Sequence, residues 1–301
     1  MRPKSRLALA AAVTAATAGV AALALAPEAG AQVSAPKAGT VHAQSATATL
    51  PSYSHIVVVM EENHSYSEII GSSSAPYINS LAAGGASMTQ SFAVTHPSEP
   101  NYMALFAGST FKLTSDKCPV SEGTTANLGS ELLAAGDTFT GYSEGLPSVG
   151  STVCTSGAYA RKHAPWVNFS NVPGSDSVPF SSFPSSSNYA SLPKLSFVIP
   201  NLNDDMHDGT VAQGDTWLKN NLSAYATWAK ANNSLLVVTW DEDDSTESNQ
   251  IATVFSGANV VTGQYSEKIN HYNVLSTLEQ LNGLAKTGNA ATAAPITDIW
   301  G

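Results

Sequence analysis

Two acidic stretches stand directly after apolar, β-branched runs, and they hold the residues of this chain best suited to chemistry. The run HIVVVM leads into Glu62 and Asn63, and the run SLLVVTW leads into Asp241 and Glu242. Such runs are typical of strands that are buried on both faces. Carboxylate and amide oxygens are the ligands that hard or borderline divalent cations prefer. The two stretches therefore predict a metal site, provided that the fold brings them together.

Both stretches also have an ordinary structural interpretation. Asn63 or Ser65 is suited to cap a following helix, and the four acids at 241–244 suit a solvated loop on a chain this acidic. Four adjacent like charges at the end of a buried strand nevertheless favour a bound cation, because they repel one another. The sequence assigns no role to Asp243 or Asp244.

A serine in a turn with two prolines is the candidate nucleophile. Ser98 lies within THPSEPN, just before a helix that is expected from Asn101 to Gly108. The N-terminus of a helix offers free N–H groups and partial positive charge to a phosphate group. A serine in that position acts as a nucleophile when a metal or a base takes its proton. The alternative is that Ser98 caps the helix and does nothing more.

Histidines accompany these motifs. Five of the seven follow an expected strand or open an expected helix, namely His64, His96, His163, His207 and His271. A neutral imidazole binds metal, and a protonated one holds phosphate oxygens. Together with the acids and Ser98, these histidines predict one site for metal and phosphate.

The elements that must position these residues alternate along the chain. Strands are expected at 55–60, near 91, and at 137–145, 195–199, 234–240 and 251–257, and helices at 75–86, 101–108, 127–136, 216–233 and 270–284. This alternation predicts an α/β fold with a mostly parallel sheet and helices on both faces. Ligands of such sheets bind outside the carboxyl ends of the strands, where the two acidic stretches would meet. Residues 170–190 are expected to form a long surface loop.

The chain divides into three parts. Residues 1–31 have a basic start, an Ala-rich apolar run and a small-residue cleavage pattern, which predicts a secretory signal peptide; a membrane anchor is the alternative. Residues 32–50 are rich in Ala, Ser and Thr and are expected to be flexible. Residues 51–301 have the length of a single α/β catalytic domain.

Charge and cysteine content restrict the partners. Removal of residues 1–31 takes away three of the 13 Lys and Arg and one of the 23 Asp and Glu, which changes the net charge from −10 to −12. This balance, without a basic stripe, argues against a nucleic-acid partner. No stable membrane insertion is expected once the signal is cleaved. In a secreted protein Cys118 and Cys154 are expected to form a disulfide; a catalytic thiol is the alternative, but neither cysteine has histidine neighbours.

Six ordered motifs resemble those of the bacterial and fungal phosphoesterase family, which contains secreted acid phosphatases and phosphatidylcholine-type phospholipases C. They are VVVMEENHSY, HPSEPNYMAL, KHAPWVNF, IPNLNDDMHDG, VVTWDEDD and NHYNVLSTLE. The resemblance spans about residues 53–285. It implies the three-layer α/β/α fold of the alkaline phosphatase-like proteins, with a mostly parallel central sheet.

Carried over position by position, the resemblance implies one divalent metal with Ser98 as the nucleophile. The implied metal ligands are Glu62, Asn63, Ser98, Asp241 and Glu242. His163, His207 and His271 would line the phosphoryl pocket beside Asn63, and one of the three would protonate the leaving oxygen.

The count of one metal follows from a departure from the pattern. Two-metal relatives carry an aspartate where this chain has Asn201. The loss of that ligand favours one metal, although Asp204 or Asp205 could substitute. Relatives also carry a histidine where this chain has Asp243.

The expected function is that of a secreted, metal-dependent phosphoric-ester hydrolase of acid phosphatase type, acting on a small phosphoester. A phospholipase C of the same family is the alternative enzyme, but the larger members carry further C-terminal domains, whereas this sequence ends soon after His271. A non-catalytic, metal-binding surface protein with the same fold is the alternative from another class. That alternative predicts a damaged nucleophile or metal set, and both are intact here. The sequence assigns no oligomeric state.

Overall fold

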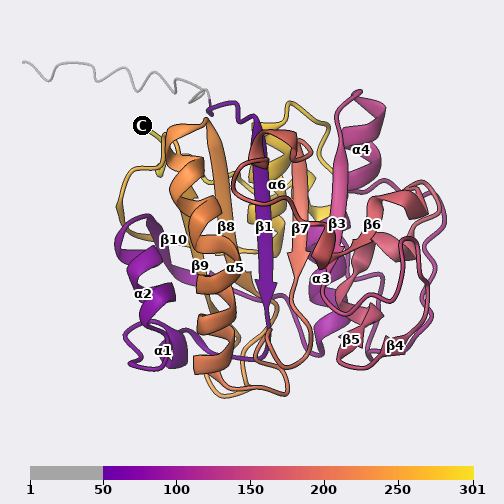
Figure 1. Ribbon diagram of the computed structural model, residues 1–301, viewed down its shortest axis with the longest axis horizontal. Coiled ribbons are helices and arrows are strands. Elements are labelled where there is room, and N and C mark those ends of the chain that lie inside the picture. The colour runs from indigo at the N-terminus through magenta and orange to yellow at the C-terminus, as the bar shows by residue number, and fades with distance from the viewer. Residues whose placement is uncertain (1–49) are drawn as a thin grey trace, which may run out of the picture. The chain divides into compact units, whose positions relative to one another are not determined.

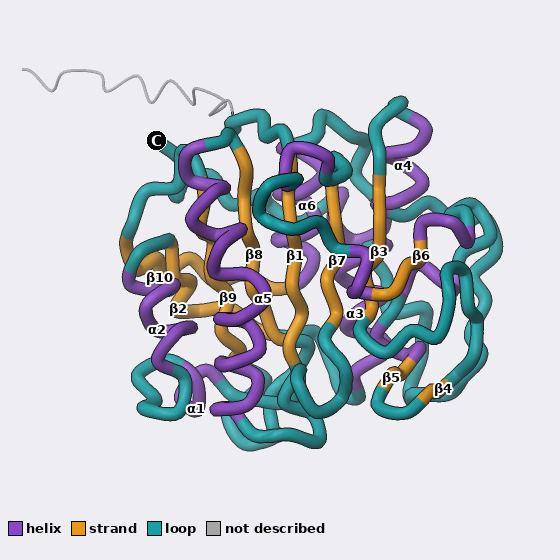
Figure 2. Tube along the Cα trace, viewed as in Figure 1, coloured by secondary structure: helices purple, strands orange, loops and turns teal. Residues whose placement is uncertain are grey.

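The structure is a computed structural model, and it describes residues 50–301. The predicted signal peptide at 1–31 and nearly all of the predicted flexible segment at 32–50 lie outside the described residues. Figures 1 and 2 show the arrangement of the helices and strands. No helix within residues 50–301 is both long enough and apolar enough to cross a membrane.

The centre of the fold is an eight-stranded sheet with the order β10–β2–β9–β8–β1–β7–β3–β6. Its strands are β1 (His55–Glu61), β2 (Ala86–Phe92), β3 (Phe139–Ser143), β6 (Ser177–Pro179), β7 (Leu195–Ile199), β8 (Ser234–Trp240), β9 (Gln250–Gly257) and β10 (Gly263–Asn270). A separate two-stranded ribbon consists of β4 (Thr155–Ser156) and β5 (Tyr159–Ala160).

The sheet is mostly parallel, as predicted. Strand β9 runs antiparallel to both of its neighbours, β8 and β2, and every other neighbouring pair is parallel. The register of β1 and β8 pairs His55 with Ser234 and Glu61 with Trp240. The two strands therefore end level with each other, so the acidic stretches that follow them lie side by side.

Helices cover both faces of the sheet. They are α1 (Tyr66–Ile69), α2 (Pro76–Ala83), α3 (Ser98–Ala107), α4 (Leu128–Ala134), α5 (Val211–Ala231) and α6 (His271–Leu281). The apolar residues of α1, α2 and α5 belong to one core and those of α3, α4 and α6 to the other. Figure 1 shows α5 in front of the sheet and α3 and α6 behind it.

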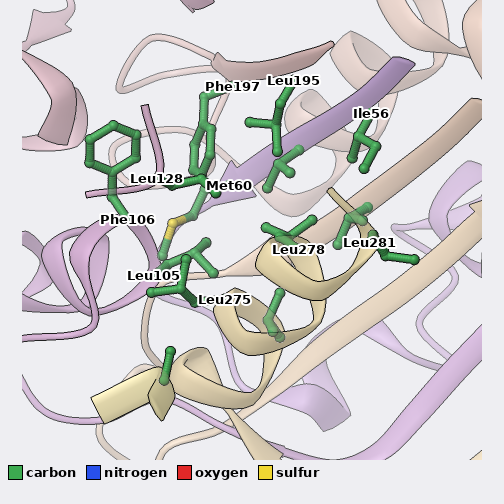
Figure 3. Close-up of a cluster of buried hydrophobic side chains, with 14 of the residues drawn as sticks. Ile56, Met60, Leu105, Phe106, Leu128, Leu195, Phe197, Leu275, Leu278 and Leu281 are labelled. Carbon is green, nitrogen blue, oxygen red and sulfur yellow. The ribbon is translucent and has the colours of Figure 1, made fainter. Parts of the chain in front are cut away.

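Alternation along β1 explains the two cores. Val57 and Val59 pack on the α5 side, whereas Ile56 and Met60 pack on the side of α3 and α6. Figure 3 shows this second cluster, with leucines of α6 beside β1 and Phe106 of α3 close by. Full burial of each such side chain contributes about 1.5–3 kcal/mol. Because side chains alternate, Glu62 follows Met60 to the α3 side.

Two helix ends differ from the expected ones, one beside a tertiary contact and one at a local cap. Helix α2 stops at Ala83 because the chain then runs close to β9: a Cβ on Gly85 would lie 2.3 Å from the carbonyl oxygen of Phe255. Helix α5 begins at Val211 because the side chain of Thr210 accepts a hydrogen bond from the backbone N–H of Gln213.

Two strands do not follow from hydrophobic runs. Strand β10 alternates between exposed and half-buried residues along the edge of the sheet, so it lacks an apolar run. The expected loop at 170–190 contains β6, which pairs with β3 over three residues.

The predicted disulfide is confirmed: Cys118 and Cys154 are bonded, with Cα atoms 5.8 Å apart.

Candidate active site

The carboxyl ends of β1 and β8 bring the two acidic stretches together. The backbone N–H of Asp241 donates to the carbonyl of Glu61 (2.9 Å), which continues the β1–β8 pairing by one residue. Asn63 has a left-handed backbone (φ 54°), and its N–H donates to Asp241 Oδ1 at 3.1 Å. Glu62 and Asp241 are fully buried. The meeting that the strand pattern predicted is therefore present.

Ser98 is the first residue of α3, and Pro97 occupies the capping position before it. The Ser98 side chain does not cap its own helix by a hydrogen bond to the helix backbone. Its hydroxyl donates to Glu62 Oε2 at 3.0 Å and is 3.3 Å from Glu242 Oε1. The interpretation of Ser98 as a simple cap does not fit these contacts.

Glu62 has a different neighbour for each oxygen. While Oε2 faces Ser98, Oε1 accepts a 2.5 Å hydrogen bond from the Tyr102 hydroxyl and lies 3.0 Å from His163 Nε2. The rings of Tyr102 and His163 stack, with centroids 4.9 Å apart. Sequence reasoning missed Tyr102, although its position four residues after Ser98, one helical turn along α3, was a usable signal.

Asp205 is an acid that the sequence offered only as a possible substitute for a missing ligand. Its Oδ2 lies 3.2 Å from His163 Nδ1, and its backbone carbonyl accepts from the N–H of Glu62 at 2.8 Å. Asp204 turns elsewhere and accepts from the amide groups of Asn201 and Gln213. Of the two possible substitutes for a missing aspartate, only Asp205 reaches this site.

Glu62, His163 and Asp205 form a group suited to a metal ion. One ligand atom from each lies within 4.8 Å of the other two, and all three residues are buried. Glu62 thus belongs both to this group and to the acids around Ser98.

Without a bound cation, the ionised forms of the buried acids in this site are unfavourable. Burial raises the pKa of Asp241 to about 8, with a further contribution from the charge of Glu242. Burial likewise raises the pKa values of Glu242 and Asp205 to about 7. The pKa of Glu62 is raised well above its ordinary range by burial and then by the charges of Asp241 and Asp205. Buried carboxylates of this kind need a compensating positive charge.

Unpaired atoms show where that charge would fit. Asp205 Oδ2, Asp241 Oδ2 and Glu242 Oε2 are buried and lack a hydrogen bond, although Asp205 Oδ2 lies 3.2 Å from His163 Nδ1 and Glu242 Oε2 lies 2.7 Å from His96 Nδ1. His163 Nε2 is also without one, because its 3.0 Å approach to Glu62 does not have hydrogen-bond geometry. Burial lowers the pKa of His163 well below its ordinary value, so the ring is neutral and can act as a ligand. These donors fit a hard or borderline divalent cation.

The other predicted histidines differ in their surroundings. His271, at the start of α6, is buried, and its Nε2 donates to the backbone carbonyl of Asp241 at 2.7 Å. Burial lowers the pKa of His271 to about 4, so this ring is neutral. His207 is partly exposed; its Nδ1 lies 2.7 Å from Asp208 Oδ1, and its Nε2 lies 3.2 Å from Lys162 Nζ.

His96 joins the site from the turn before Ser98. Its Nδ1 is 2.7 Å from Glu242 Oε2 and its Nε2 is 3.2 Å from Asp243 Oδ1. The sequence marked His96 as part of a motif but gave it no role. Asp243 also accepts from three backbone N–H groups of the loop that follows β8, whereas Asp244 is exposed.

The fold is that of the alkaline phosphatase superfamily. A solved member of that superfamily from Vibrio parahaemolyticus superimposes with a TM-score of 0.60 at 14% identity, covering 84% of this chain and 72% of that one. The lipoteichoic acid synthase LtaP from Listeria monocytogenes gives a TM-score of 0.59 at 12% identity, covering 82% of this chain and 76% of that one. At these identities the likeness concerns the fold alone.

The chain belongs to the Phosphoesterase family, whose model matches residues 72–285. The phosphatidylinositol-3-phosphatase of Mycobacterium tuberculosis is 67% identical over 85% of this chain and 86% of its own. An acid phosphatase of Aspergillus fumigatus is 30% identical over 73% of this chain, which spans about half (53%) of that longer protein. The chain is accordingly a hydrolase that acts on phosphoric esters, as the motifs predicted.

Proposed function

We propose that this protein is a secreted, metal-dependent phosphomonoesterase that uses Ser98 as its nucleophile. The observation that carries the proposal is the position of the Ser98 hydroxyl. Ser98 is the first residue of α3. Its hydroxyl lies 3.0 Å from Glu62 Oε2 and 3.3 Å from Glu242 Oε1, which belong to two buried carboxylates. Secretion rests on the sequence of residues 1–31 and agrees with the disulfide.

The metal would be held at the edge where β1 and β8 end. The proposed ligands are those that the motifs imply: Glu62, Asn63, Ser98, Asp241 and Glu242. His163 and Asp205 support this set from the far side of Glu62. A divalent cation bound there supplies positive charge to the Ser98 oxygen and to the phosphoryl group.

The reaction follows from the contacts of Ser98. A carboxylate beside the hydroxyl accepts its proton, and Oγ attacks phosphorus as the phosphorus–oxygen ester bond breaks. The alcohol leaves with a proton, and a phosphoserine remains. Water then attacks phosphorus, which releases inorganic phosphate and restores the Ser98 hydroxyl. The N–H of Ser98 at the start of α3 would stabilise a phosphoryl oxygen, whereas the N–H of Glu99 is bound by Asp116 and Pro100 has no N–H.

We assign different tasks to the three predicted histidines. His163 contacts Glu62 and Asp205, and His271 holds the backbone of Asp241, so both orient acids of the site. His207 is the one of the three with appreciable exposed surface. We therefore place His207 on the side of the leaving group.

The proposed substrate class is the phosphomonoester. The M. tuberculosis relative is named a phosphatidylinositol-3-phosphatase, and the fungal relatives are named acid phosphatases. The 3-phosphate of phosphatidylinositol is consequently the first natural substrate to test. A phospholipase C activity, which cleaves a diester, is the less favoured alternative.

The test is to assay the purified protein on p-nitrophenyl phosphate, bis(p-nitrophenyl) phosphate, phosphatidylcholine and phosphatidylinositol 3-phosphate, with and without EDTA. We expect turnover of the monoesters, its loss after chelation and its recovery when a divalent metal is restored. Full activity in a preparation shown by elemental analysis to be metal-free would refute the metal-dependent mechanism. Faster turnover of phosphatidylcholine than of either monoester would instead identify a phospholipase C.

A further inference from the structure

A partly exposed lysine lies beside this acidic site, and the predicted site did not include it. Lys162 directly precedes His163 in a short 3₁₀ helix, Arg161–His163, and its side chain is 16% exposed. The ammonium lies 2.8 Å from Asp116 Oδ2 and 3.2 Å from His207 Nε2. The neighbouring Arg161 points elsewhere and donates to backbone carbonyls of the surrounding loops.

The contact with Lys162 sets the direction of the hydrogen bonds of His207. An ammonium group can only donate, so His207 Nε2 accepts and its proton is on Nδ1, where it donates to Asp208. Lys162 therefore supplies a positive charge beside the acids of the site.

Asp116 connects Lys162 to the nucleophile. While Oδ2 binds the ammonium, Oδ1 accepts a hydrogen bond from the backbone N–H of Glu99 at 2.9 Å. Glu99 follows Ser98 at the start of α3. One carboxylate therefore binds both the lysine and the helix N-terminus, which are the two kinds of group that proteins use to bind phosphate.

The loop that carries Asp116 is covalently anchored. Asp116 lies two residues before Cys118, and the disulfide joins Cys118 to Cys154, next to β4. The position of Asp116, and through it that of Lys162, is thereby fixed from outside the sheet.

We infer that Lys162 binds a non-bridging oxygen of the substrate's phosphoryl group and makes the site selective for dianionic monoesters over monoanionic diesters, with Asp116 as the positioning residue. The inference rests on the proposed function. An anionic substrate must approach four buried acids, each of which is at most 6% exposed: Glu62, Asp205, Asp241 and Glu242. The compact ammonium of Lys162 offsets this repulsion, and its attraction is greater for the ester with two charges.

The test compares Lys162→Met, which keeps the length of the stem but removes the charge, with Lys162→Arg, which keeps the charge. Lys219→Met, an exposed lysine on α5, is the matched control. The metal-loaded proteins are assayed for KM and kcat on p-nitrophenyl phosphate and bis(p-nitrophenyl) phosphate, and for inhibition by inorganic phosphate.

We expect Lys162→Met to raise both the monoester KM and the phosphate Ki by about 10- to 100-fold, as for the loss of a charged hydrogen bond. Its effect on the diester KM should stay below about 3-fold, since a diester offers one charge fewer. Lys162→Arg should recover most of the loss. Asp116→Asn should raise the monoester KM by a smaller factor than Lys162→Met. An equal loss on both esters, or an unchanged phosphate Ki, would overturn the inference.

A phosphate-binding measurement separates this inference from the proposed function. If the wild type hydrolyses neither ester, the proposed function fails, and calorimetric titration with inorganic phosphate still decides the role of Lys162. Weaker phosphate binding by Lys162→Met would then support that role, and equal binding would overturn it. If Lys162→Met does not give a normal thermal melt, Lys162→Gln takes its place with the same outcomes.

Discussion

The carboxylate of Asp215 on α5 and that of Asp241 after β8 are both buried, but they have very different surroundings. Asp215 Oδ1 accepts from the N–H of Ile78 at 2.8 Å, and Oδ2 accepts from that of Tyr77 at 3.2 Å. Asp215 therefore accepts hydrogen bonds from two N–H groups at the start of α2, where a negative charge is favoured. Asp241 accepts from Asn63 through Oδ1, and its Oδ2 has no hydrogen bond.

The difference indicates what each region is for. Asp215 has both oxygens paired with backbone N–H groups, so its burial is compensated. Asp205, Asp241 and Glu242 each keep a buried oxygen without a hydrogen bond. Such atoms are costly in an empty site and favourable around a cation. Substitutions in the two regions should therefore change different properties of the protein.

The largest effect is expected from Ser98→Ala. The covalent step needs the hydroxyl, so kcat on a phosphomonoester should fall by at least about 1,000-fold. The thermal melt should stay close to that of the wild type because the helix keeps its cap and its packing. Ser80→Ala, on the exposed side of α2, is the control and should change neither property. A nearly normal kcat for Ser98→Ala would rule out a covalent phosphoserine.

The next largest effect concerns the metal. Asp241→Asn should lower activity by about 100-fold or more, since even outer partners of metal ligands contribute 10- to 100-fold. EDTA should lower the melting temperature of the wild type but not that of Asp241→Asn. In metal-free protein the variant should melt higher than the wild type, because it removes one of the repelling carboxylates. Glu62→Gln should behave in the same way. Metal analysis by mass spectrometry and thermal melts with and without EDTA check these outcomes. A wild-type melting temperature that EDTA does not change would contradict them.

Asp215→Asn should show the opposite behaviour. The variant keeps one acceptor but places an amide NH₂ against a backbone N–H, which costs about 1–3 kcal/mol of unfolding free energy. Metal content and kcat should be those of the wild type. Urea unfolding measures the free energy of unfolding, and the monoester assay measures kcat. If Asp215→Asn lost activity at unchanged stability, the distinction between the two regions would be wrong.

The smallest effect is expected from Tyr102→Phe. The ring keeps its stack on His163, but Glu62 loses the hydroxyl that donates to Oε1. We expect about a 10-fold loss in metal affinity or kcat, as for other partners that orient a ligand. Tyr225→Phe is the control on the opposite face, where the hydroxyl donates to the backbone carbonyl of Leu235. It should change stability alone, and equal activity losses in both variants would remove the special role of Tyr102.

Much of the fold could be predicted because its signals are local. The apolar runs of β1 and β8 and the alternation of strands with helices predicted the mostly parallel sheet and the meeting of the acids at one edge. What escaped prediction were elements without an apolar run. Strand β10 lies at the edge of the sheet with alternate residues exposed, and β6 is only three residues long.

The sequence by itself determined which side of β1 each acid occupies. Side chains alternate along a strand, so Glu62 had to follow Met60 toward α3. The sequence also placed Ser98 at the start of a helix and put the second acidic pair at the end of another buried strand. These features depend on neighbours within a few residues, and periodicity is enough to specify them.

Only the tertiary structure decided which loop residues reach the site. Asp205 rather than Asp204 meets His163, and the turn that makes this possible includes Met206 with a positive φ of 80°. Likewise, only the structure shows that His271 Nε2 donates to the backbone carbonyl of Asp241. Contacts of this kind depend on where separate loops lie after the sheet has formed, and no local periodicity encodes that.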